Sequence, residues 1–220
     1  MSYAEYNSNS STKGLWHLNG NSTDSSSNAN NGTDTAITYG LGYGKFGQGA
    51  NFNGTSSDIN IASNLGIDGG NITISAWTNF SDLTVLRELF STLSATSKVG
   101  YYIETNSTLI RFYRVKKGVV ADAVTYTVSL STGVWYHYVL TYDGTNIKGY
   151  FNGNLVGTTA TSGNGATVVT SQSHIGTEDG TGNFMNGSID EVIVENRAWS
   201  TSEIRRYYAQ AKGRLASNIL

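Results

Sequence analysis

Apolar and polar residues alternate at a period of two along most of this chain. The alternation covers residues 59–62, 72–78, 99–104, 109–115, 119–128, 135–142, 146–152 and 187–195. Because successive side chains of a strand point to opposite faces, this period is typical of β-strands with one face buried. Shorter apolar segments at residues 14–18 and 50–52 predict two further strands. The pattern therefore predicts a chain built almost entirely of strands.

Turn residues separate these segments, and two of the turns predict hairpins. Asp143 and Gly144 lie between residues 135–141 and 147–151, and Asn152 and Gly153 come directly before a short apolar segment. Both dipeptides readily adopt the positive φ of tight hairpin turns. Many short strands with such connections predict an all-β fold, an antiparallel β-sandwich (jelly roll) with two curved sheets.

One segment near the C-terminus predicts a short helix. Ser200 and Glu203 have the spacing of a capping box, and Ile204, Tyr207 and Tyr208 would share one face of the helix that follows. We expect this helix over residues 201–211. Residues 83–89 fit a short helix or a strand equally well.

The length and the spacing of these elements indicate one domain. The chain has 220 residues, which suits a single large β-sandwich. We expect a disordered or extended lead-in over residues 1–13, the jelly-roll domain over residues 14–211 and a tail over residues 212–220.

Composition narrows the classes of partner. Charged residues make up 14% of the chain and the formal net charge is −2, so no overall field attracts nucleic acid or an anionic membrane. No apolar run approaches the roughly 18 residues of a membrane span. The chain contains no cysteine, which excludes disulfides and thiolate metal sites. We therefore expect neither nucleic-acid binding nor membrane insertion.

The expected location is extracellular, or the surface of a cell or virion. A low-charge, cysteine-free chain rich in Asn, Ser, Thr and Gly fits a bacterial or viral surface protein. Residues 1–10 lack the basic start and apolar core of a signal peptide. Export would therefore use another route or a leader outside this sequence, or the chain would be assembled inside a cell as part of a virus particle.

Several segments, taken in order, carry a resemblance to a known family. They are GLWHLNGN (residues 14–21), FGQGANFNG (46–54), ITISAWTNF (72–80), WYHYVLTYDGTNIKGYFNGNLVG (135–157) and FMNGSIDEVIVENRAWSTSEI (184–204). Together they resemble the laminin-G-like jelly-roll domains of the concanavalin-A-like lectin and glucanase superfamily. The resemblance implies two antiparallel sheets packed face to face, one of them concave. It also implies a module that is usually noncatalytic and binds glycans or proteins.

The resemblance further implies a structural calcium ion near the aspartate of the closing strand, here Asp190. The expected companions are Asn53 and Asp24, because calcium takes six to eight oxygen ligands from carboxylates, amides and carbonyls. Asn53 stands where many relatives carry aspartate, which lowers the ligand charge. The alternative is that Asp190 accepts hydrogen bonds from nearby backbone amides.

Basic and aromatic residues gather between positions 87 and 117. They are Arg87, Lys98, Arg111, Arg114, Lys116 and Lys117, with Tyr101, Tyr102, Phe112 and Tyr113 between them. Aromatic rings stack on the apolar faces of sugars, and guanidinium groups bond their oxygens.

The period of two pairs Tyr102 with Glu104 and Arg111 with Tyr113 on strand faces. We hypothesise that these four residues face the concave surface and bind a polysaccharide or glycoconjugate. The basic character of the segment favours an acidic or sulfated glycan. The alternative is that the aromatic residues belong to the core and the charges to a solvated rim.

The resulting hypothesis is a noncatalytic, lectin-like module of a surface or secreted protein that binds glycan on a concave sheet face or on a loop rim. No E-x-D-x-(x)-E arrangement of the retaining glucanases of this fold is present, which argues against an enzyme. The alternative is a structural or adhesive module, such as a viral appendage or a cell-surface domain, that contacts a protein or other domains of a larger chain.

Overall fold

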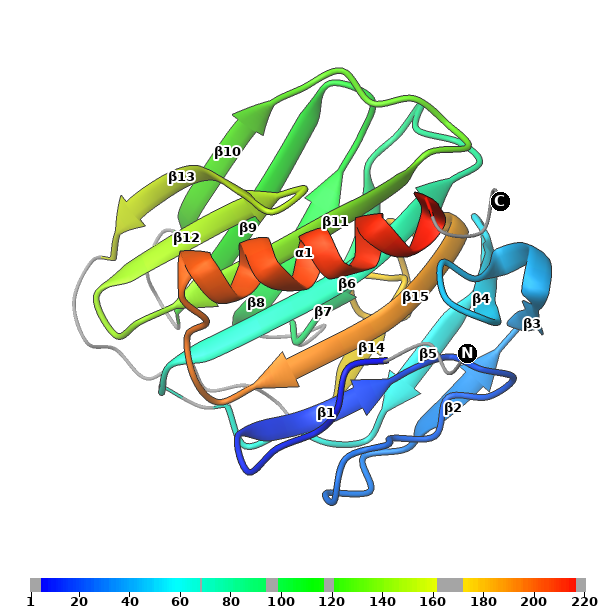
Figure 1. Ribbon diagram of the computed structural model, residues 1–220, viewed down its shortest axis with the longest axis horizontal. Helices are drawn as coiled ribbons and strands as arrows, with labels where there is room; N and C mark the ends of the chain where they lie inside the picture. Colours follow the sequence, from blue (N-terminus) through cyan, green and yellow to red (C-terminus); the bar gives the residue numbers. More distant parts are fainter. Residues whose placement is uncertain (1–4, 68, 94–98, 117–120, 162–171, 217–220) are drawn as a thin grey trace.

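Two antiparallel sheets packed face to face make up the computed structural model of this protein, and a helix lies across the larger sheet (Figure 1). The structure describes residues 5–67, 69–93, 99–116, 121–161 and 172–216. This architecture confirms the predicted antiparallel sandwich with a C-terminal helix.

Sheet A is the larger sheet, and the strand β15 (Asn186–Glu195) lies in its middle. Its order is β13 (Asn154–Ala160), β12 (Asn146–Phe151), β11 (Trp135–Tyr142), β6 (Ile72–Phe80), β15, β4 (Gly49–Asn53) and β3 (Thr38–Gly40). One side of β15 pairs with β6, and the other pairs first with β4 and then with β1 (Thr12–Trp16). A bulge between Asp190 and Ile193 separates the two parts.

Sheet B packs against sheet A and contains the segment with the predicted glycan-binding residues. Its order is β10 (Asp122–Thr127), β9 (Leu109–Val115), β8 (Gly100–Thr105), β7 (Arg87–Ser91), β14 (Ser173–Ile175), β5 (Asp58–Ile61) and β2 (Gly32–Thr35). A single 3₁₀ turn, η1 (Leu41–Tyr43), lies between β3 and β4 within the described residues.

Strands with a clear alternation of apolar and polar residues lie where the sequence predicts them. The bounds of β9 and β11 are those expected, and both predicted hairpins form, joining β11 to β12 and β12 to β13. The ambiguous segment 83–89 leads into a strand, β7. The short strands β2, β3 and β14 were missed, because three or four polar residues carry no recognisable period. Residues 119–120 of one expected strand lie outside the described residues.

The inward faces of the two sheets form the hydrophobic core. Tyr101, Ile103 and Phe112 point inward from sheet B, and Ile74 and Leu140 point inward from sheet A; all five are fully buried. Burying such a side chain contributes about 1.5–3 kcal/mol each, so the alternating apolar positions account for the packing of the sheets.

The helix α1 (Thr201–Ala216) covers the outer face of sheet A (Figure 1). Its predicted capping box is present, since Ser200 N donates to Glu203 at 2.7 Å and Glu203 N donates to the Ser200 hydroxyl at 3.2 Å. Ile204 packs with Leu15, Val139 and Ile193. The helix runs beyond the expected end at residue 211, and β1 begins before the expected start of the domain at residue 14.

The close approach of the sheets gives a test of this packing. A methyl group on Gly149 of β12 would lie 2.4 Å from the ring of Phe112, so the sheets would have to separate locally. We expect Gly149→Ala to lower the free energy of unfolding by about 1–3 kcal/mol, the usual effect of overpacking a core. Denaturant unfolding measures the change. Gly42→Ala is the control, because no atom lies within 4 Å of the added methyl group. Equal stability of the two variants would contradict the described packing.

Candidate functional site

The four residues predicted to bind glycan share the outer face of sheet B. Tyr102 and Tyr113 are paired across β8 and β9, and so are Glu104 and Arg111. Their neighbours Tyr101, Ile103 and Phe112 are buried in the core, which rules out the alternative that Tyr102 and Tyr113 are core residues. We call Tyr102, Glu104, Arg111 and Tyr113 the sheet B patch.

Within the sheet B patch the side chains hold one another in place. The rings of Tyr102 and Tyr113 stack with centroids 4.4 Å apart and planes at 18°. Arg111 Nε lies 3.0 Å from Glu104 Oε1, and Arg111 Nη1 donates to the Tyr113 hydroxyl at 3.2 Å. The patch therefore offers a preorganised aromatic pair beside a guanidinium and a carboxylate.

Small side chains flank the tyrosine pair on both sides. Ser91 of β7 is the cross-strand neighbour of Tyr102, and Ala123 of β10 is the neighbour of Tyr113. Both tyrosines remain partly exposed. Ala123 is partly exposed, whereas Ser91 is fully buried. The ring face of Tyr113 on the β10 side is therefore the one available for stacking by a planar or C–H-rich ligand.

The other half of the same face is closed by the loop after β14. A methyl group on Gly180 of this loop would lie 3.5 Å from Asp58 Oδ2 and 3.6 Å from the ring of His174. Asp58 and His174 lie 3.1 Å apart and are buried. Among the described residues, this loop covers the part of the face over β14 and β5 and not the part over β8, β9 and β10.

Burial and nearby carboxylates set the protonation of the patch. Burial raises the pKa of Glu104, Glu178 raises it further, and the guanidinium of Arg111 opposes both. Burial, and then the charge of Glu104, also raises the pKa of Tyr102. The Tyr102 hydroxyl therefore stays protonated and can donate a hydrogen bond to a ligand.

The fold does not gather the basic side chains of this region on one surface. Arg87 pairs with Asp82 and donates to the carbonyl of Phe184 at 2.9 Å. Arg114 points inward, pairs with Asp122 at 3.2 Å and lies over the ring of Tyr142.

Lys98 and Lys117 lie outside the described residues. Among the described residues of this face, Arg111 carries a positive charge, whereas Asp58, Glu88, Glu104 and Glu178 are acidic. The expected basic surface is therefore not found in the described part of the chain.

The structure does not bring together the residues expected to bind calcium. Both oxygens of Asp24 accept hydrogen bonds, among them from the backbone amides of Leu15 at 2.9 Å and Asn30 at 2.8 Å. The side-chain oxygen of Asn53 closes its own turn by accepting from the amides of Thr55, Ser56 and Ser57.

Asp190 lies elsewhere, in the bulge of β15. Its Oδ2 accepts from the amides of Lys45 at 2.7 Å and Phe46 at 2.8 Å, which is the alternative considered for this residue. Asn53 pairs with Asn186, four residues along β15 from Asp190, a separation of about 13 Å at the rise of a strand. These three residues do not fit one shared calcium site, and the structural calcium ion itself stays a prediction from the resemblance.

A histidine beside the bulge joins the N-terminal segment to sheet A. His17 Nδ1 lies 2.6 Å from Glu191 Oε1, and its Nε2 lies 3.8 Å from Glu5. Burial lowers the pKa of His17, but the hydrogen bond and charge of Glu191, with the charge of Glu5, outweigh it and raise the pKa overall. The two carboxylates hold opposite sides of one ring.

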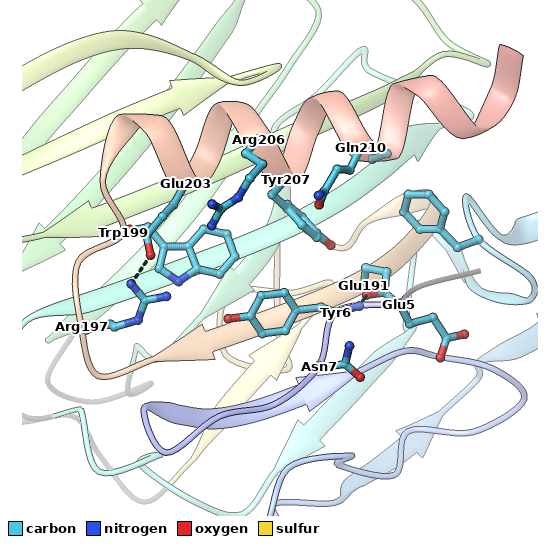
Figure 2. Close-up of a pocket in the computed structure, with 12 residues that line it drawn as sticks. Glu5, Tyr6, Asn7, Glu191, Arg197, Trp199, Glu203, Arg206, Tyr207 and Gln210 are labelled. Atoms are coloured by element: carbon cyan, nitrogen blue, oxygen red, sulfur yellow. Dashed lines mark hydrogen bonds and ion pairs between the residues drawn. The ribbon is translucent and has the colours of Figure 1, made fainter. Parts of the chain in front are cut away.

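A cavity of about 280 Å³ lies between α1, the N-terminal segment and β15 (Figure 2). Tyr6, Trp199 and Tyr207 form its aromatic wall, with ring centroids 5.4–5.8 Å apart. Arg206 and Gln210 of α1 also line it. Sequence reasoning missed this cavity because residues 5–7 were assigned to the lead-in, and their contacts with the helix are not local.

Comparison with known proteins agrees with this architecture. Residues 53–205 match the laminin-G-like family described as the concanavalin A-like lectin/glucanases superfamily. The chain belongs to this superfamily. A comparison with curated proteins gives no match.

Solved structures of other proteins share this fold. Domain 4 of AbnA, an extracellular arabinanase of Geobacillus stearothermophilus in complex with arabinotriose, has a TM-score of 0.70 and 20% identity, covering 89% of this chain and 97% of that domain. The binding domain of botulinum neurotoxin serotype G has a TM-score of 0.70 and 14% identity, covering 90% of this chain. The serotype D domain in complex with N-acetylneuraminic acid has a TM-score of 0.72 and 13% identity, covering 90% of this chain. This chain spans about half the length of the two neurotoxin domains, 50% in each case.

Calcium dependence can be measured directly. Because Asp24 and Asn53 are engaged in their own loops and Asp190 in two amide contacts, we expect the melting temperature to be the same with excess calcium and with EDTA. Differential scanning calorimetry measures it. A rise in the melting temperature with calcium that is lost in Asp190→Asn would instead support a calcium site at Asp190.

The buried carboxylate of Asp190 predicts a pH dependence of stability. Burial, and then the charge of Glu191, raises the pKa of Asp190 well above its usual value. The folded chain therefore binds this proton more tightly than the unfolded chain, and the contribution destabilises the fold as pH rises above about 4. We expect Asp190→Asn to be more stable than the natural chain at neutral pH. The difference in the free energy of unfolding should become smaller as the pH falls toward about 4.

Denaturant unfolding over a pH series tests this expectation. The reference is the natural chain, measured over the same pH series. A neutral-pH stability of Asp190→Asn below that of the natural chain would show that the charged form is the stabilising one.

Proposed function

We propose that this protein is a noncatalytic, lectin-like module that binds glycan on the sheet B patch. The observation that carries the proposal is the stacked pair of Tyr102 and Tyr113, partly exposed and flanked by the small residues Ser91 and Ala123. A sugar ring presents a C–H face to such a ring and hydroxyls to the groups around it.

The polar residues of the patch complement the aromatic pair. Arg111 and Glu104 already contact each other, so their remaining donors and acceptors are oriented before a ligand arrives. Preorganised groups lose little side-chain entropy on binding. This arrangement favours hydrogen bonds to adjacent sugar hydroxyls.

The charge of the surroundings favours a neutral glycan over an acidic one. The described carboxylates around Arg111 include Glu88, Glu104 and Glu178, and a second negative group brought by a ligand would be repelled. The arabinanase domain of the same fold, in complex with arabinotriose, makes neutral arabino-oligosaccharides the first ligands to test.

The proposal includes a noncatalytic role at an extracellular or surface location. Solved structures of similar fold include domains in complex with arabinotriose, with N-acetylneuraminic acid and with rat synaptotagmin II. In the described residues no helix is long and apolar enough to cross a bilayer. Protein contact by the same face is the rival proposal, which absence of binding to every glycan of the panel below would favour.

Substitution of the stacking residues tests the proposal. We expect Tyr102→Ala and Tyr113→Ala each to weaken binding of arabinotriose about tenfold or more, because each removes a ring worth ~1.4 kcal/mol or more of stacking. Isothermal titration calorimetry measures the dissociation constant. A panel with neutral xylo- and gluco-oligosaccharides and an acidic oligogalacturonide identifies the preferred class.

The matched control is Tyr43→Ala, a partly buried tyrosine of η1 beside sheet A, which should bind like the natural chain. Thermal melting confirms that each variant is folded. Absence of binding to every glycan of the panel would refute the proposal, as would equal binding by all three variants.

A further inference from the structure

Three residues that can bind a metal ion lie together beside the cavity beneath α1. They are Glu5 of the N-terminal segment, His17 directly after β1 and Glu191 in the bulge of β15, and one ligand atom of each lies within 4.8 Å of the others. Glu5 and Glu191 also line the cavity (Figure 2). This group lies at sheet A, whereas the patch of the proposed function lies on sheet B, so the two are independent.

The imidazole of His17 presents one nitrogen to each carboxylate. Nδ1 lies 2.6 Å from Glu191 Oε1, a hydrogen-bond distance, and Nε2 lies 3.8 Å from Glu5 Oε2. Because a carboxylate accepts hydrogen bonds, Nδ1 carries the proton of the neutral ring, and the lone pair of Nε2 is directed toward Glu5. A carboxylate that fixes the tautomer in this way is the usual partner of a metal-binding histidine.

The distances indicate which atoms can bind the ion directly. Zinc lies about 2.0–2.2 Å from imidazole nitrogen and carboxylate oxygen, so one ion reaches both His17 Nε2 and Glu5 Oε2 across their 3.8 Å separation. Two ligands of a tetrahedral zinc ion are about 3.3 Å apart, so Nδ1 and Glu191 Oε1, at 2.6 Å, are too close to share one. Glu191 therefore orients the histidine, while His17 and Glu5 supply the bonds.

Glu5 is also oriented, and the site is open to water. The side-chain amide of Asn19 donates to Glu5 Oε1 at 2.7 Å, which leaves Oε2 for the ion. The side chain of Glu5 is 37% exposed and that of His17 16%, so water can complete the coordination. The adjoining cavity of about 280 Å³ has room for such water molecules.

The charge of the cavity wall favours a cation. Its charged residues are Glu5, Glu191, Glu203, Arg197 and Arg206. Glu203 is paired with Arg197 at 2.6 Å. Within the described residues, Glu5 and Glu191 form ion pairs with His17 and with no lysine or arginine. Two carboxylates that share one imidazole leave a negative charge that a divalent ion would neutralise.

A hydroxyl without a partner lies at the same cavity. Tyr207 extends from α1 toward β15 in Figure 2, and its hydroxyl oxygen is buried and makes no hydrogen bond within the described residues. Burial, and then the charge of Glu191, raises the pKa of Tyr207 well above its usual value, so the hydroxyl keeps its proton. Buried polar groups without a partner are rare in proteins and indicate a water molecule or ion nearby. The Tyr207 hydroxyl is thus available to a water molecule of the site.

We propose that His17 and Glu5 bind a divalent transition-metal ion of the zinc type, with Glu191 orienting the imidazole and water completing the coordination. Imidazole is a good ligand for zinc, whereas calcium takes oxygen ligands. None of the three residues expected to bind calcium takes part, so the two sites are distinct. The ion would join the N-terminal segment to the end of β1 and thereby stabilise one wall of the cavity.

The experiment starts from protein that has been stripped of metal with EDTA and dialysed. Zinc chloride is titrated by isothermal titration calorimetry, and calcium chloride is the comparison. We expect saturable binding of a single zinc ion per chain, with calcium weaker by at least about tenfold. NMR spectra of the ¹⁵N-labelled histidine rings locate the ion: the resonance of His17 Nε2 should shift while those of the buried His137 and His174 stay unchanged.

Variants separate coordination from the general charge of the cavity. His17→Ala and Glu5→Gln should each weaken zinc binding by at least about tenfold, and Glu191→Gln by about 10–100-fold through the lost orientation of the ring. The control is Glu203→Gln, which removes a charge from the same cavity but no ligand, and should leave zinc binding unchanged. Thermal melting confirms that each variant is folded. Because Glu5 is partly exposed, Glu5→Gln tests the proposal even if a buried substitution prevents folding.

Four results would overturn the proposal. They are no saturable binding of zinc, calcium binding as tightly as zinc, equal zinc binding by Glu5→Gln and Glu203→Gln, and a zinc-dependent shift of another histidine in place of His17. Tyr102→Ala should bind zinc like the natural chain, so the outcome does not depend on glycan binding at the sheet B patch.

Discussion

The burial of one face of each sheet against the other is the constraint on which the rest of this structure depends. In β8, Tyr101 and Ile103 point into the core and Tyr102 and Glu104 point out, and shifting the strand by one residue would exchange the two sets. The cost of exposing the apolar set holds the register. It therefore also decides which side chains of the strands reach solvent on the two outer faces of the sandwich.

The outer face of sheet A is used mainly for structure. The bulge of β15 places Asp190 and Glu191 side by side, with Glu191 at a φ of 51°, a strained value for a residue with a side chain. The fold retains this strain because the two carboxylates hold the segments before β4: Asp190 binds the amides of Lys45 and Phe46, and Glu191 binds His17. A bulge that redirects side chains in this way is typical of a functional or anchoring position.

The helix that covers this face also buries polar groups beneath it. His137 is fully buried, and burial lowers its pKa to about 3, so the ring stays neutral and lies 2.8 Å from the hydroxyl of Ser75. It stacks on Trp77, which is buried under α1 and not between the sheets. A cavity lies between this helix and the N-terminal segment, and among the described residues no element covers the face of sheet B over β8 to β10. The candidate glycan-binding surface thus lies where the described elements leave a sheet uncovered.

The sequence by itself determined the sandwich, most of its longer strands, the hairpins and the capped helix, because alternation, turn dipeptides and caps act between residues close in the chain. The same alternation placed Tyr102, Glu104, Arg111 and Tyr113 on one face. Tertiary structure alone decided what lies beside them. Arg87 bonds the carbonyl of Phe184, Asp190 bonds amides of residues 45 and 46, and Tyr6 packs on Trp199. These partners are far apart in sequence, and only the pairing order of the strands and the position of α1 bring them together, so no local pattern predicts them.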